Sequence, residues 1–294
     1  MMIALMVRWD IKMTLDIIIN INNLEKTIET LYNKLEEELK DIKYNLIFVD
    51  NDSTDKTLDI LKTIQKKNDS CVKIVSLSKQ SDKDTCIYTG LLHTKHKLVC
   101  IYDIDTMQIS QILKMYEHIT KHKEFDQVCL LSNYEEKRFL KKNKLKLFNK
   151  LFNLDYDYNK SYGRIMNRYV VNAIIEYTKN KPFSLYTFNE IGFNTYYLKT
   201  DNKKIDDIDY KKLIEYSTNK SKIFNTITLI LLTISFIYLL MIILELFNVN
   251  NNVILLFILL TNALNLYLHG LLFKTKENTV VLIKEKIGFD EDVL

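Results

Sequence analysis

Glycine and proline, the residues that normally shape tight turns, are scarce in this chain: its 294 residues include 5 Gly and 1 Pro. Asparagine, lysine and isoleucine are over-used instead, which indicates compositional drift. Such drift weakens motif matching. The order and spacing of several elements are therefore stronger evidence for a fold or function than any single motif.

A large excess of either charge is also absent. The chain has 41 Lys and Arg and 37 Asp and Glu, which gives a net charge of +4. The concentrated basic footprint of a nucleic-acid-binding protein is missing, so we expect no nucleic-acid partner. The cysteines have no CxxC spacing and lie mostly in apolar runs, as buried free thiols do. They are Cys71, Cys86, Cys100 and Cys129. We expect a reducing, cytoplasmic environment.

We expect no secretory signal in the first twelve residues, because this apolar stretch is too short and too interrupted. Met13 directly precedes the first clear strand, so either Met1 or Met13 is the start. Residues 1–13 are expected to form an N-terminal extension.

Two long apolar stretches near the C-terminus predict a transmembrane hairpin. Residues 223–247 contain one ionisable side chain, Glu245, and exceed the roughly 20 residues that span a hydrocarbon core. Residues 253–273 are also apolar and follow a short polar turn at 248–252. The alternative is a buried helical pair in a soluble protein, but such helices normally keep a polar face.

Lysines flank the two stretches on the side away from the turn, which itself has no basic residue. By the positive-inside rule, the large N-terminal domain and both termini, including a tail at 274–294, are cytoplasmic. Asn262, Asn265 and His269 fall on nearly one face of the second stretch. We expect this face to contact the first helix or another subunit, which leaves a homo-oligomer open. The flanking lysines are Lys220, Lys222, Lys274 and Lys276.

The residues before the hairpin alternate between short apolar, β-branched runs and amphipathic segments. Such alternation requires crossover connections and predicts an α/β fold of nucleotide-binding type, with a mostly parallel sheet and helices on both faces. The expected strands are 15–21, 44–49, 72–77, 98–102 and 127–131, and the expected helices 24–39, 57–66, 84–94 and 109–122.

Ligands of such sheets bind beyond the carboxyl ends of the strands, so the residues after each strand are candidates for chemistry. Asp103 and Asp105 follow the fourth strand, and both carboxylates can reach one divalent cation. Hard oxygen ligands suit Mg²⁺ or Mn²⁺ bridging a diphosphate. An isolated DxD is otherwise a weak signal.

Two further loops offer polar groups, each with a simpler alternative. Asp50 and Asn51 open a loop rich in carboxylates that could bind a base or ribose, although DNDSTD also simply caps a helix. Lys79 and Lys83 follow the third strand and could bind an anion, or could be solvated surface lysines.

A segment at 139–152 has apolar residues on one side and lysines on the other. It is predicted to be an interfacial helix at a membrane surface. An ordinary amphipathic helix packed on the sheet is the alternative.

In order and spacing, the chain resembles the inverting family 2 glycosyltransferases of the GT-A fold over about residues 14–290. With the hairpin, it looks most like the polyprenyl-phosphate branch, akin to dolichol-phosphate mannose synthase and the bacterial bactoprenol glucosyltransferases. The resemblance rests on a strand ending near Asn23, then VDNDSTDKTLDIL, SLSKQSDKDTCIYTGL and IYDID.

On the donor side, the resemblance implies that Asp103 and Asp105 form the metal-binding and catalytic DxD, with Asp103 also near the nucleotide. It further implies nucleotide contacts for Lys83, which falls on the lysine of the family's N-x-G-K segment, and for three polar residues of the first two loops. Those residues are Asn23, Asp50 and Asn51.

On the acceptor side, the family's G-D-F-R segment reads Ser-Tyr-Gly-Arg at 161–164. Arg164 is therefore implied near the acceptor phosphate, whereas the family's acidic residue has become Tyr162. The opening P-x-Y-N-E keeps only its asparagine. The diphosphate-gripping R-x-x-G-x-S-K is not recognisable in KTDNKKIDDIDYKKL, which leaves Lys203, Lys204, Lys211 or Lys212 as substitutes.

The resemblance implies an inverting transfer of a sugar from a nucleotide-sugar donor to a polyprenyl phosphate, with Mg²⁺ or Mn²⁺. A phosphate acceptor is already anionic, so loss of an acidic base at Tyr162 need not abolish transfer. It divides the chain into a GT-A domain at 14–135, an acceptor-side region at 136–222 and the hairpin. The rival interpretation is a non-catalytic relative that acts as an assembly partner in cell-surface glycan synthesis, which the altered motifs favour.

Overall fold

The protein is described here by a computed structural model with two compact units. The first unit comprises residues 1–134, 157–206 and 278–294, and the second comprises 135–156 and 207–277. The residues that the structure describes are 13–132, 139–152, 159–179, 182–200, 220–243, 259–265, 267 and 283–289.

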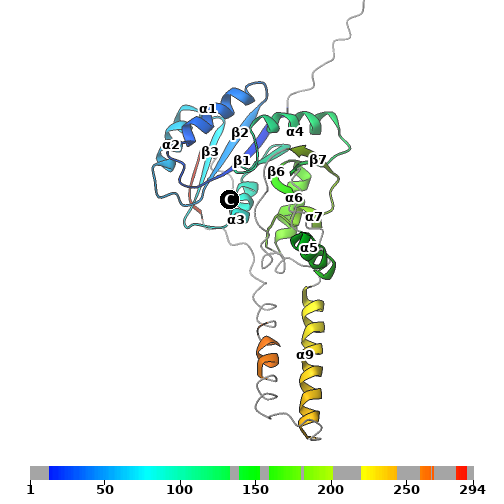
Figure 1. Ribbon diagram of the computed structural model, residues 1–294. Helices are drawn as coiled ribbons and strands as arrows, with labels where there is room; N and C mark the ends of the chain where they lie inside the picture. Colours follow the sequence, from blue (N-terminus) through cyan, green and yellow to red (C-terminus); the bar gives the residue numbers. More distant parts are fainter. Residues whose placement is uncertain are drawn as a thin grey trace, which may run out of the picture. The chain divides into compact units, whose positions relative to one another are not determined.

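The first unit is built on one eight-stranded sheet with the order β7-β5-β6-β4-β1-β2-β3-β8 (Figure 1). The strands β1 to β4 are parallel, and β6 and β8 run antiparallel to their neighbours. The strands are β1 (Leu15–Ile21), β2 (Tyr44–Asp50), β3 (Val72–Leu77), β4 (Leu98–Tyr102), β5 (Gln127–Ser132), β6 (Lys160–Asn167), β7 (Thr195–Thr200) and β8 (Ile283–Ile287). The predicted α/β fold with a mostly parallel sheet is confirmed.

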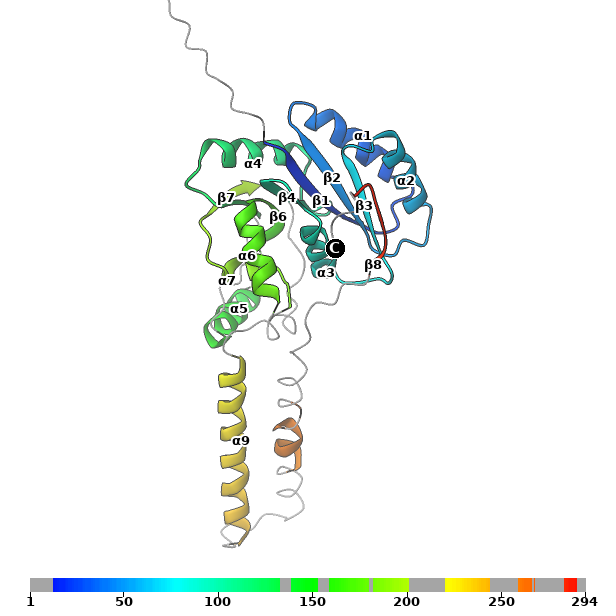
Figure 2. The same cartoon turned by 180° about the vertical axis from the view of Figure 1, so that it is seen from behind.

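Helices cover both faces of this sheet, as Figures 1 and 2 show. The helices α1, α2 and α4 pack on one face, and α3 and α6 pack on the other. The alternating side chains of β1 supply both cores, with Ile17 and Ile19 facing one and Ile18 the other. The helices of this unit are α1 (Ile28–Leu39), α2 (Thr57–Lys67), α3 (Lys83–Leu92), α4 (Ser110–Lys121), α6 (Arg168–Thr178) and α7 (Thr187–Glu190).

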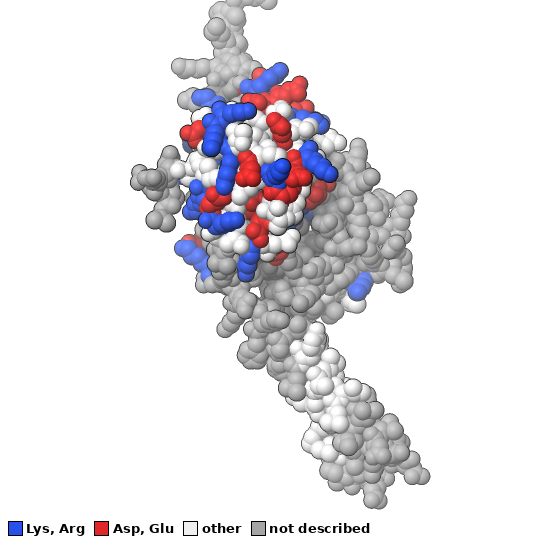
Figure 3. All heavy atoms as spheres, turned by 90° about the vertical axis from the view of Figure 1, so that its left-hand side faces the viewer, with Lys and Arg blue, Asp and Glu red and all other residues white. Residues whose placement is uncertain are grey.

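The outer face of α1 and α2 carries both signs of charge, with basic and acidic side chains interspersed (Figure 3). The described part of this face has no continuous basic surface. This distribution agrees with the balanced composition of the chain.

Helix α3 lies against β1 because Gly90 has no side chain. A Cβ built at this position would lie 2.3 Å from Ile18 Cγ2 and 3.3 Å from Ile18 Cβ. Both are close to the backbone of a buried strand, so the clash cannot be relieved by rotating a flexible chain end. The close approach of α3 brings its first turn to the carboxyl end of β1.

We expect Gly90→Ala to destabilise the protein despite the better helix propensity of alanine. Overpacking a core costs about 1–3 kcal/mol, and the propensity gain offsets at most about 1 kcal/mol. Thermal unfolding should show a lower midpoint. The same change in an Ile18→Ala background should cost little, since the clashing methyl group is gone. A raised midpoint for Gly90→Ala alone would contradict this account.

At the amino end of β1, Asp16 is buried and collects hydrogen bonds from several elements. Its Oδ2 accepts from the backbone amides of Lys95, at 2.7 Å, and His96, at 2.8 Å. Its Oδ1 accepts from Asn45 Nδ2 at 2.9 Å and lies 2.7 Å from His96 Nδ1, and Arg168 is 3.7 Å away. This carboxylate therefore ties β1, β2, the loop before β4 and α6 together, at the end of the sheet opposite the predicted site.

The chain returns to the sheet after the second unit. Strand β8 pairs antiparallel with β3, and Glu285 forms an ion pair with Lys62 of α2 at 2.7 Å. The glycine that follows, Gly288, has a φ of 79°, and a Cβ there would lie 2.7 Å from Val72 O. The tail predicted at 274–294 thus contributes an edge strand to the first unit.

The second unit contains α5 (Phe139–Phe152), α9 (Lys220–Ile243) and a helical segment at 259–265. Helix α5, predicted at the same residues, contacts α9. The hairpin predicted at 223–247 and 253–273 is described only in part, and its turn lies outside the described residues. Among the residues available to such a test, the structure contains no helix of sufficient length and apolarity to cross a membrane.

In the described parts of α9 and of the segment at 259–265, several polar side chains are buried while many large apolar ones are exposed. Ser235 Oγ lies 2.8 Å from Thr261 Oγ1 across the two helical segments, and Thr228 and Asn265 are also buried. The exposed side chains, each 47–64% accessible, are Leu229, Ile230, Leu232, Phe236, Ile237, Leu239, Leu259, Leu260, Leu264 and Tyr267. An exposed apolar surface of this kind commonly marks a site of interaction with protein or membrane.

Candidate functional site

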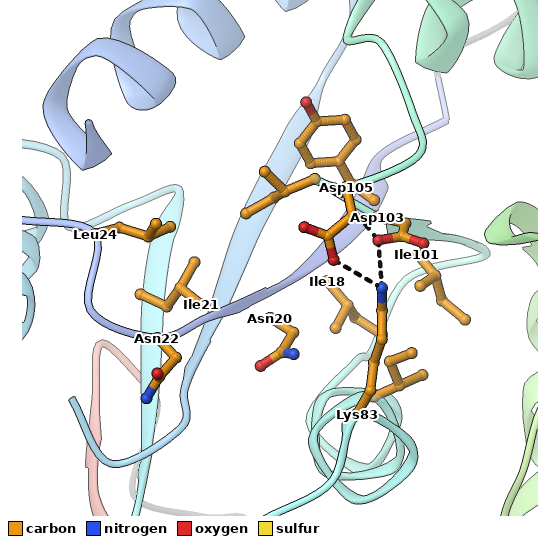
Figure 4. Close-up of a pocket in the computed structure, with 12 residues that line it drawn as sticks. Ile18, Asn20, Ile21, Asn22, Leu24, Lys83, Ile101, Asp103 and Asp105 are labelled. Carbon is orange, nitrogen blue, oxygen red and sulfur yellow. Dashed lines mark hydrogen bonds and ion pairs between the residues drawn. The ribbon is translucent and has the colours of Figure 1, made fainter. Parts of the chain in front are cut away.

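A pocket of about 200 Å³ lies at the carboxyl ends of β1 and β4, beside the first turn of α3. Apolar side chains of these elements form part of its wall. Its polar lining residues are Asn20, Asn22, Lys83, Asp103 and Asp105 (Figure 4). This is the edge of a parallel sheet where ligands are expected to bind.

Asp103 is the buried anchor of the pocket, with 2% of its side chain exposed. Its Oδ1 accepts a hydrogen bond from Lys83 Nζ at 2.6 Å, and its Oδ2 accepts one from Thr106 Oγ1 at 2.7 Å. Thr106 Oγ1 in turn lies 2.9 Å from Ser161 Oγ of β6. The orientation of this carboxylate is therefore fixed from two sides.

Asp105 differs from Asp103 because 80% of its side chain is exposed. Its Oδ2 lies 3.1 Å from Lys83 Nζ, so one ammonium group bridges both carboxylates, as Figure 4 shows. Burial alone would lower the pKa of Lys83, but Asp103 and then Asp105 outweigh it and raise that pKa above its usual value. Lys83 is therefore a permanent cation in the pocket.

The start of α3 determines the position of Lys83. Asp82 is the N-cap residue, and its side chain accepts a hydrogen bond from Thr85 N at 2.8 Å. Lys83 is the first helical residue, and its Nζ lies 5.5 Å from the centre of the Tyr162 ring. The cap and the ring thus direct a long, flexible side chain toward the two aspartates.

The Tyr162 hydroxyl donates a hydrogen bond to Asp84 of α3, a residue that is 3% exposed. Burial, and then the charge of Asp84, raises the pKa of Tyr162 well above its usual value, so the phenol stays protonated. The family's acidic residue at this position is thus replaced by a phenol paired with a carboxylate from another element.

The oxygen atoms of the pocket fit a hard divalent cation such as Mg²⁺ or Mn²⁺. Two carboxylates face one point, and Asn20 Oδ1 is a buried oxygen without a hydrogen-bond partner among the described residues. In the same part of the chain, no group of three or more Asp, Glu, His or Cys could hold a metal. A cation bound by Asp103 and Asp105 would therefore need ligands from water or a substrate as well.

The residues predicted on the first two loops do not line this pocket. Asp50 is fully buried, and its Oδ2 accepts a hydrogen bond from Ser76 Oγ at 3.0 Å. The Asn51 side chain bonds the backbone N–H of Ser81 at 2.8 Å and its carbonyl at 2.9 Å. Asn23 has a φ of 51°, and its side chain accepts from the backbone of the neighbouring loop. These contacts fix the loops, and nucleotide binding by these residues stays a prediction.

Arg164 is not brought to the pocket either. It is 3% exposed, donates to Ser161 O at 2.8 Å, and its guanidinium carbon lies 3.5 Å from the centre of the Phe188 ring. Its donors are thus directed into the core of the unit. Such burial does not support the predicted contact with an acceptor phosphate.

The sequence profile described as "Glycosyl transferase family 2" matches residues 16–204, which is more than half of the chain and includes the whole pocket. The chain belongs to glycosyl transferase family 2. This places the pocket, with its DxD after β4, in the GT-A-like domain of a known transferase family.

Two curated relatives of this family 2 chain are named as glycosyltransferases. CsbB of Bacillus subtilis (strain 168) is 28% identical over 187 residues, which are 61% of this chain and 56% of CsbB. The uncharacterized glycosyltransferase sll0501 of Synechocystis is 27% identical over 197 residues, 64% of this chain and 61% of the relative. The chain thus matches less than two thirds of the length of either relative.

Solved structures similar to this family 2 chain are more distant. Residues 1–349 of TarS from S. aureus show 19% identity and a TM-score of 0.46, over 69% of this chain and 64% of that one. The mannosyltransferase PcManGT of Pyrobaculum calidifontis, in complex with GDP-Man and Mn²⁺, shows 15% identity and a TM-score of 0.46, over 70% and 61%.

Asn20 and Asn22 are pocket residues of this family 2 chain that the sequence did not single out as a site. They stand at the end of β1, and Asn22 Nδ2 also donates to Asn51 O at 2.7 Å. They lie in the segment that stands where the family has its opening P-x-Y-N-E. The signal available in the sequence was asparagine at alternate positions, Asn20 and Asn22, where the apolar run that starts at Leu15 ends.

Proposed function

We propose that this chain is a membrane-bound glycosyltransferase that moves a sugar from a nucleotide-sugar donor to a polyprenyl phosphate, with inversion. The observation that carries this proposal is the cluster of Asp103, Asp105 and Lys83 at the carboxyl end of β4. Membership of glycosyl transferase family 2 supports the class of reaction. The base and the sugar of the donor are left open.

The pocket residues suit the departure of a nucleoside diphosphate. Asp103 and Asp105 would hold a Mg²⁺ or Mn²⁺ ion, which supplies positive charge that offsets the charge developing on the leaving group. Lys83 adds a second positive charge from the chain itself. Asn20 and Asn22 offer amide groups to the polar parts of the donor.

A phosphate acceptor suits the environment of Tyr162. The phenol is protonated and donates to Asp84, so it is not a free base. An acceptor hydroxyl would need a base to remove its proton, whereas a phosphate monoester is already anionic at neutral pH. The chemistry of this position thus favours an anionic acceptor.

The second unit supports attachment to a membrane. Its described helices expose large apolar side chains and bury Thr228, Ser235, Thr261 and Asn265. Exposed apolar surface is favourable in lipid, and polar side chains between helices are a common means of association there. The mostly apolar stretches at 223–247 and 253–273 each reach the roughly 20 residues needed to span the hydrocarbon core.

Strands on both sides of this segment favour two crossings. Both β7 and β8 belong to one sheet, and residues 201–282 connect them. A folded sheet lies on one side of a bilayer, so a segment that leaves it and returns must cross an even number of times. This supports a hairpin with both ends on one side, and the flanking lysines favour the cytoplasmic side by the positive-inside rule.

The test is a transfer assay with detergent-purified full-length protein. Polyprenyl phosphate, Mn²⁺ or Mg²⁺ and each of a panel of nucleotide sugars are combined, and lipid-linked sugar is measured. We expect metal-dependent product from at least one donor, and protein that stays in the membrane pellet after carbonate extraction. Product on a sugar hydroxyl but not on polyprenyl phosphate would overturn the acceptor.

A second candidate function is a non-catalytic assembly partner in glycan synthesis. It is favoured by Asp50, Asn51 and Arg164, whose side chains are engaged in contacts within the fold. This candidate predicts no turnover with any donor and no nucleotide binding that depends on Asp103. Such a result would replace the transferase proposal.

A further inference from the structure

We propose that the Lys83 ammonium occupies the position between Asp103 and Asp105 where a divalent ion would bind. A divalent ion would then have to displace the ammonium. The displaced ammonium would then be free to bind the diphosphate of the donor. Metal and diphosphate would therefore bind cooperatively, with Lys83 as the coupling element. This inference rests on the proposed function, since it assumes a nucleoside diphosphate in the pocket.

The geometry of the ion pair supports exchange rather than simultaneous binding. Lys83 Nζ lies 2.6 Å from Asp103 Oδ1 and 3.1 Å from Asp105 Oδ2, and these two carboxylates are the ones available to a metal. A divalent ion and an ammonium group that share the same two oxygens would repel each other at close range. Competition for these two oxygens therefore favours exchange of one cation for the other.

Burial explains why a cation is needed at this position when the metal is absent. Only 2% of the Asp103 side chain is exposed, and removing the partner of a buried charge is strongly destabilising. Lys83 meets this need with a flexible side chain of which 24% is exposed. The buried Asp103 carboxylate therefore always has a cationic partner, first Lys83 and then the metal.

The pocket also contains an oxygen atom that could accept a hydrogen bond from the displaced ammonium. The register pairs Ile19 with Tyr102, so the next step along the strands brings Asn20 level with Asp103. Asn20 Oδ1 has no hydrogen-bond partner among the described residues and lines the same pocket as Lys83 (Figure 4). A lysine that leaves the carboxylates can approach this oxygen and a diphosphate without leaving the pocket.

A purely structural ion pair is the alternative, and Asp105 argues against it. A structural pair would keep both carboxylates inside, whereas 80% of the Asp105 side chain is open to solvent. Exposed ion pairs contribute little to stability. An open carboxylate beside a buried one is instead suited to a ligand that enters from solvent.

The experiment measures Mn²⁺ binding to the full-length protein, without sugar transfer, by the loss of the free Mn²⁺ electron paramagnetic resonance signal. We expect Lys83→Met to bind Mn²⁺ roughly tenfold more tightly than the unmodified protein, within the 5–150-fold range typical of coupling. Lys83→Arg, which keeps the charge, should bind Mn²⁺ as weakly as the unmodified protein. Lys66→Met removes an exposed lysine at the end of α2 and should change nothing.

Adding UDP or GDP then tests the coupling. Either nucleotide chelates Mn²⁺ directly, so the informative quantity is the increase in Mn²⁺ affinity, which should be larger in the unmodified protein than in Lys83→Met. If Lys83→Met unfolds, Lys83→Gln replaces it, and circular dichroism checks that each variant is folded.

Equal or weaker Mn²⁺ binding by the neutral variants than by the unmodified protein would overturn the exchange. Metal-dependent turnover together with equal Mn²⁺ affinity in the unmodified protein and Lys83→Met would overturn the exchange while leaving the transferase proposal intact.

Discussion

Asp103→Asn should lower sugar transfer by about 10²–10³-fold, because the metal ion and Lys83 both depend on this carboxylate. Loss of one preorganised electrostatic group in a water-poor site typically has an effect of this size. The amide has nearly the same shape but removes the charge that pairs with Lys83 Nζ at 2.6 Å. Initial rates at saturating donor and varied Mn²⁺ measure both the loss of kcat and the rise in metal requirement.

Two comparisons separate this effect from unfolding. Asp105→Asn should cost less, because water can replace an oxygen ligand at a side chain that is 80% exposed. Asp59→Asn, at an exposed position of α2, should leave the rate unchanged. Full activity of Asp103→Asn with an unchanged Mn²⁺ dependence would contradict the assignment of the site.

The second large effect is expected on stability, at the other end of β1. Asp16→Ala leaves the amides of Lys95 and His96 and the Asn45 side chain without their acceptor. It also leaves Arg168 without a nearby carboxylate. Breaking such a buried cluster costs about 3–5 kcal/mol, which lowers the melting temperature by roughly 10 °C for a domain of this size.

Thermal unfolding of detergent-purified protein, followed by circular dichroism, measures this loss, with Asp59→Asn as the control. The prediction fails if Asp16→Ala melts within a degree or two of the unmodified protein. Mn²⁺ binding to Asp16→Ala below its melting temperature should be normal, because Asp16 and the pocket lie at opposite ends of β1.

The same residue predicts a dependence of stability on pH. Burial alone would raise the pKa of Asp16, but hydrogen bonds from His96, Asn45 and Lys95 outweigh it and hold that pKa below the usual 3.8. A folded pKa below the unfolded value means that the stabilisation is complete above about pH 4 and is lost as the pH falls toward the folded pKa. The difference in melting temperature between the unmodified protein and Asp16→Ala should therefore shrink below pH 4. A difference that stays constant to pH 2.5 would contradict this.

The sequence predicted the strands and helices that can be recognised from the pattern of apolar residues within a single segment. Strands β1 to β5 are short apolar runs separated by amphipathic helices, and each was expected within one residue of its observed ends. Strands β7 and β8 were missed because their side chains are only partly buried. Their pairing partners lie far away in sequence, and β6 was recognised only as a motif around Arg164.

The sequence could predict a site residue only where its place just after a parallel strand is enough to bring it to the pocket. Asp103, Asp105 and Lys83 each follow directly or closely after a parallel strand, and the structure brings them together. Asp50 stands at a similar position, but its carboxylate bonds Ser76 on the neighbouring strand. Spacing along the chain cannot show which partner a side chain finds across the sheet. For the same reason it could not show that Arg164, implied near the acceptor phosphate, is buried within the unit.

Strand β8 has a consequence for the order in which the molecule is made. Its partner β3 emerges from the ribosome about two hundred residues earlier, so that edge of the sheet stays unpaired during most of synthesis. An open edge strand can pair with another chain and lead to aggregation. Nascent chains stalled before residue 283 should therefore be the stage at which this protein most needs chaperones.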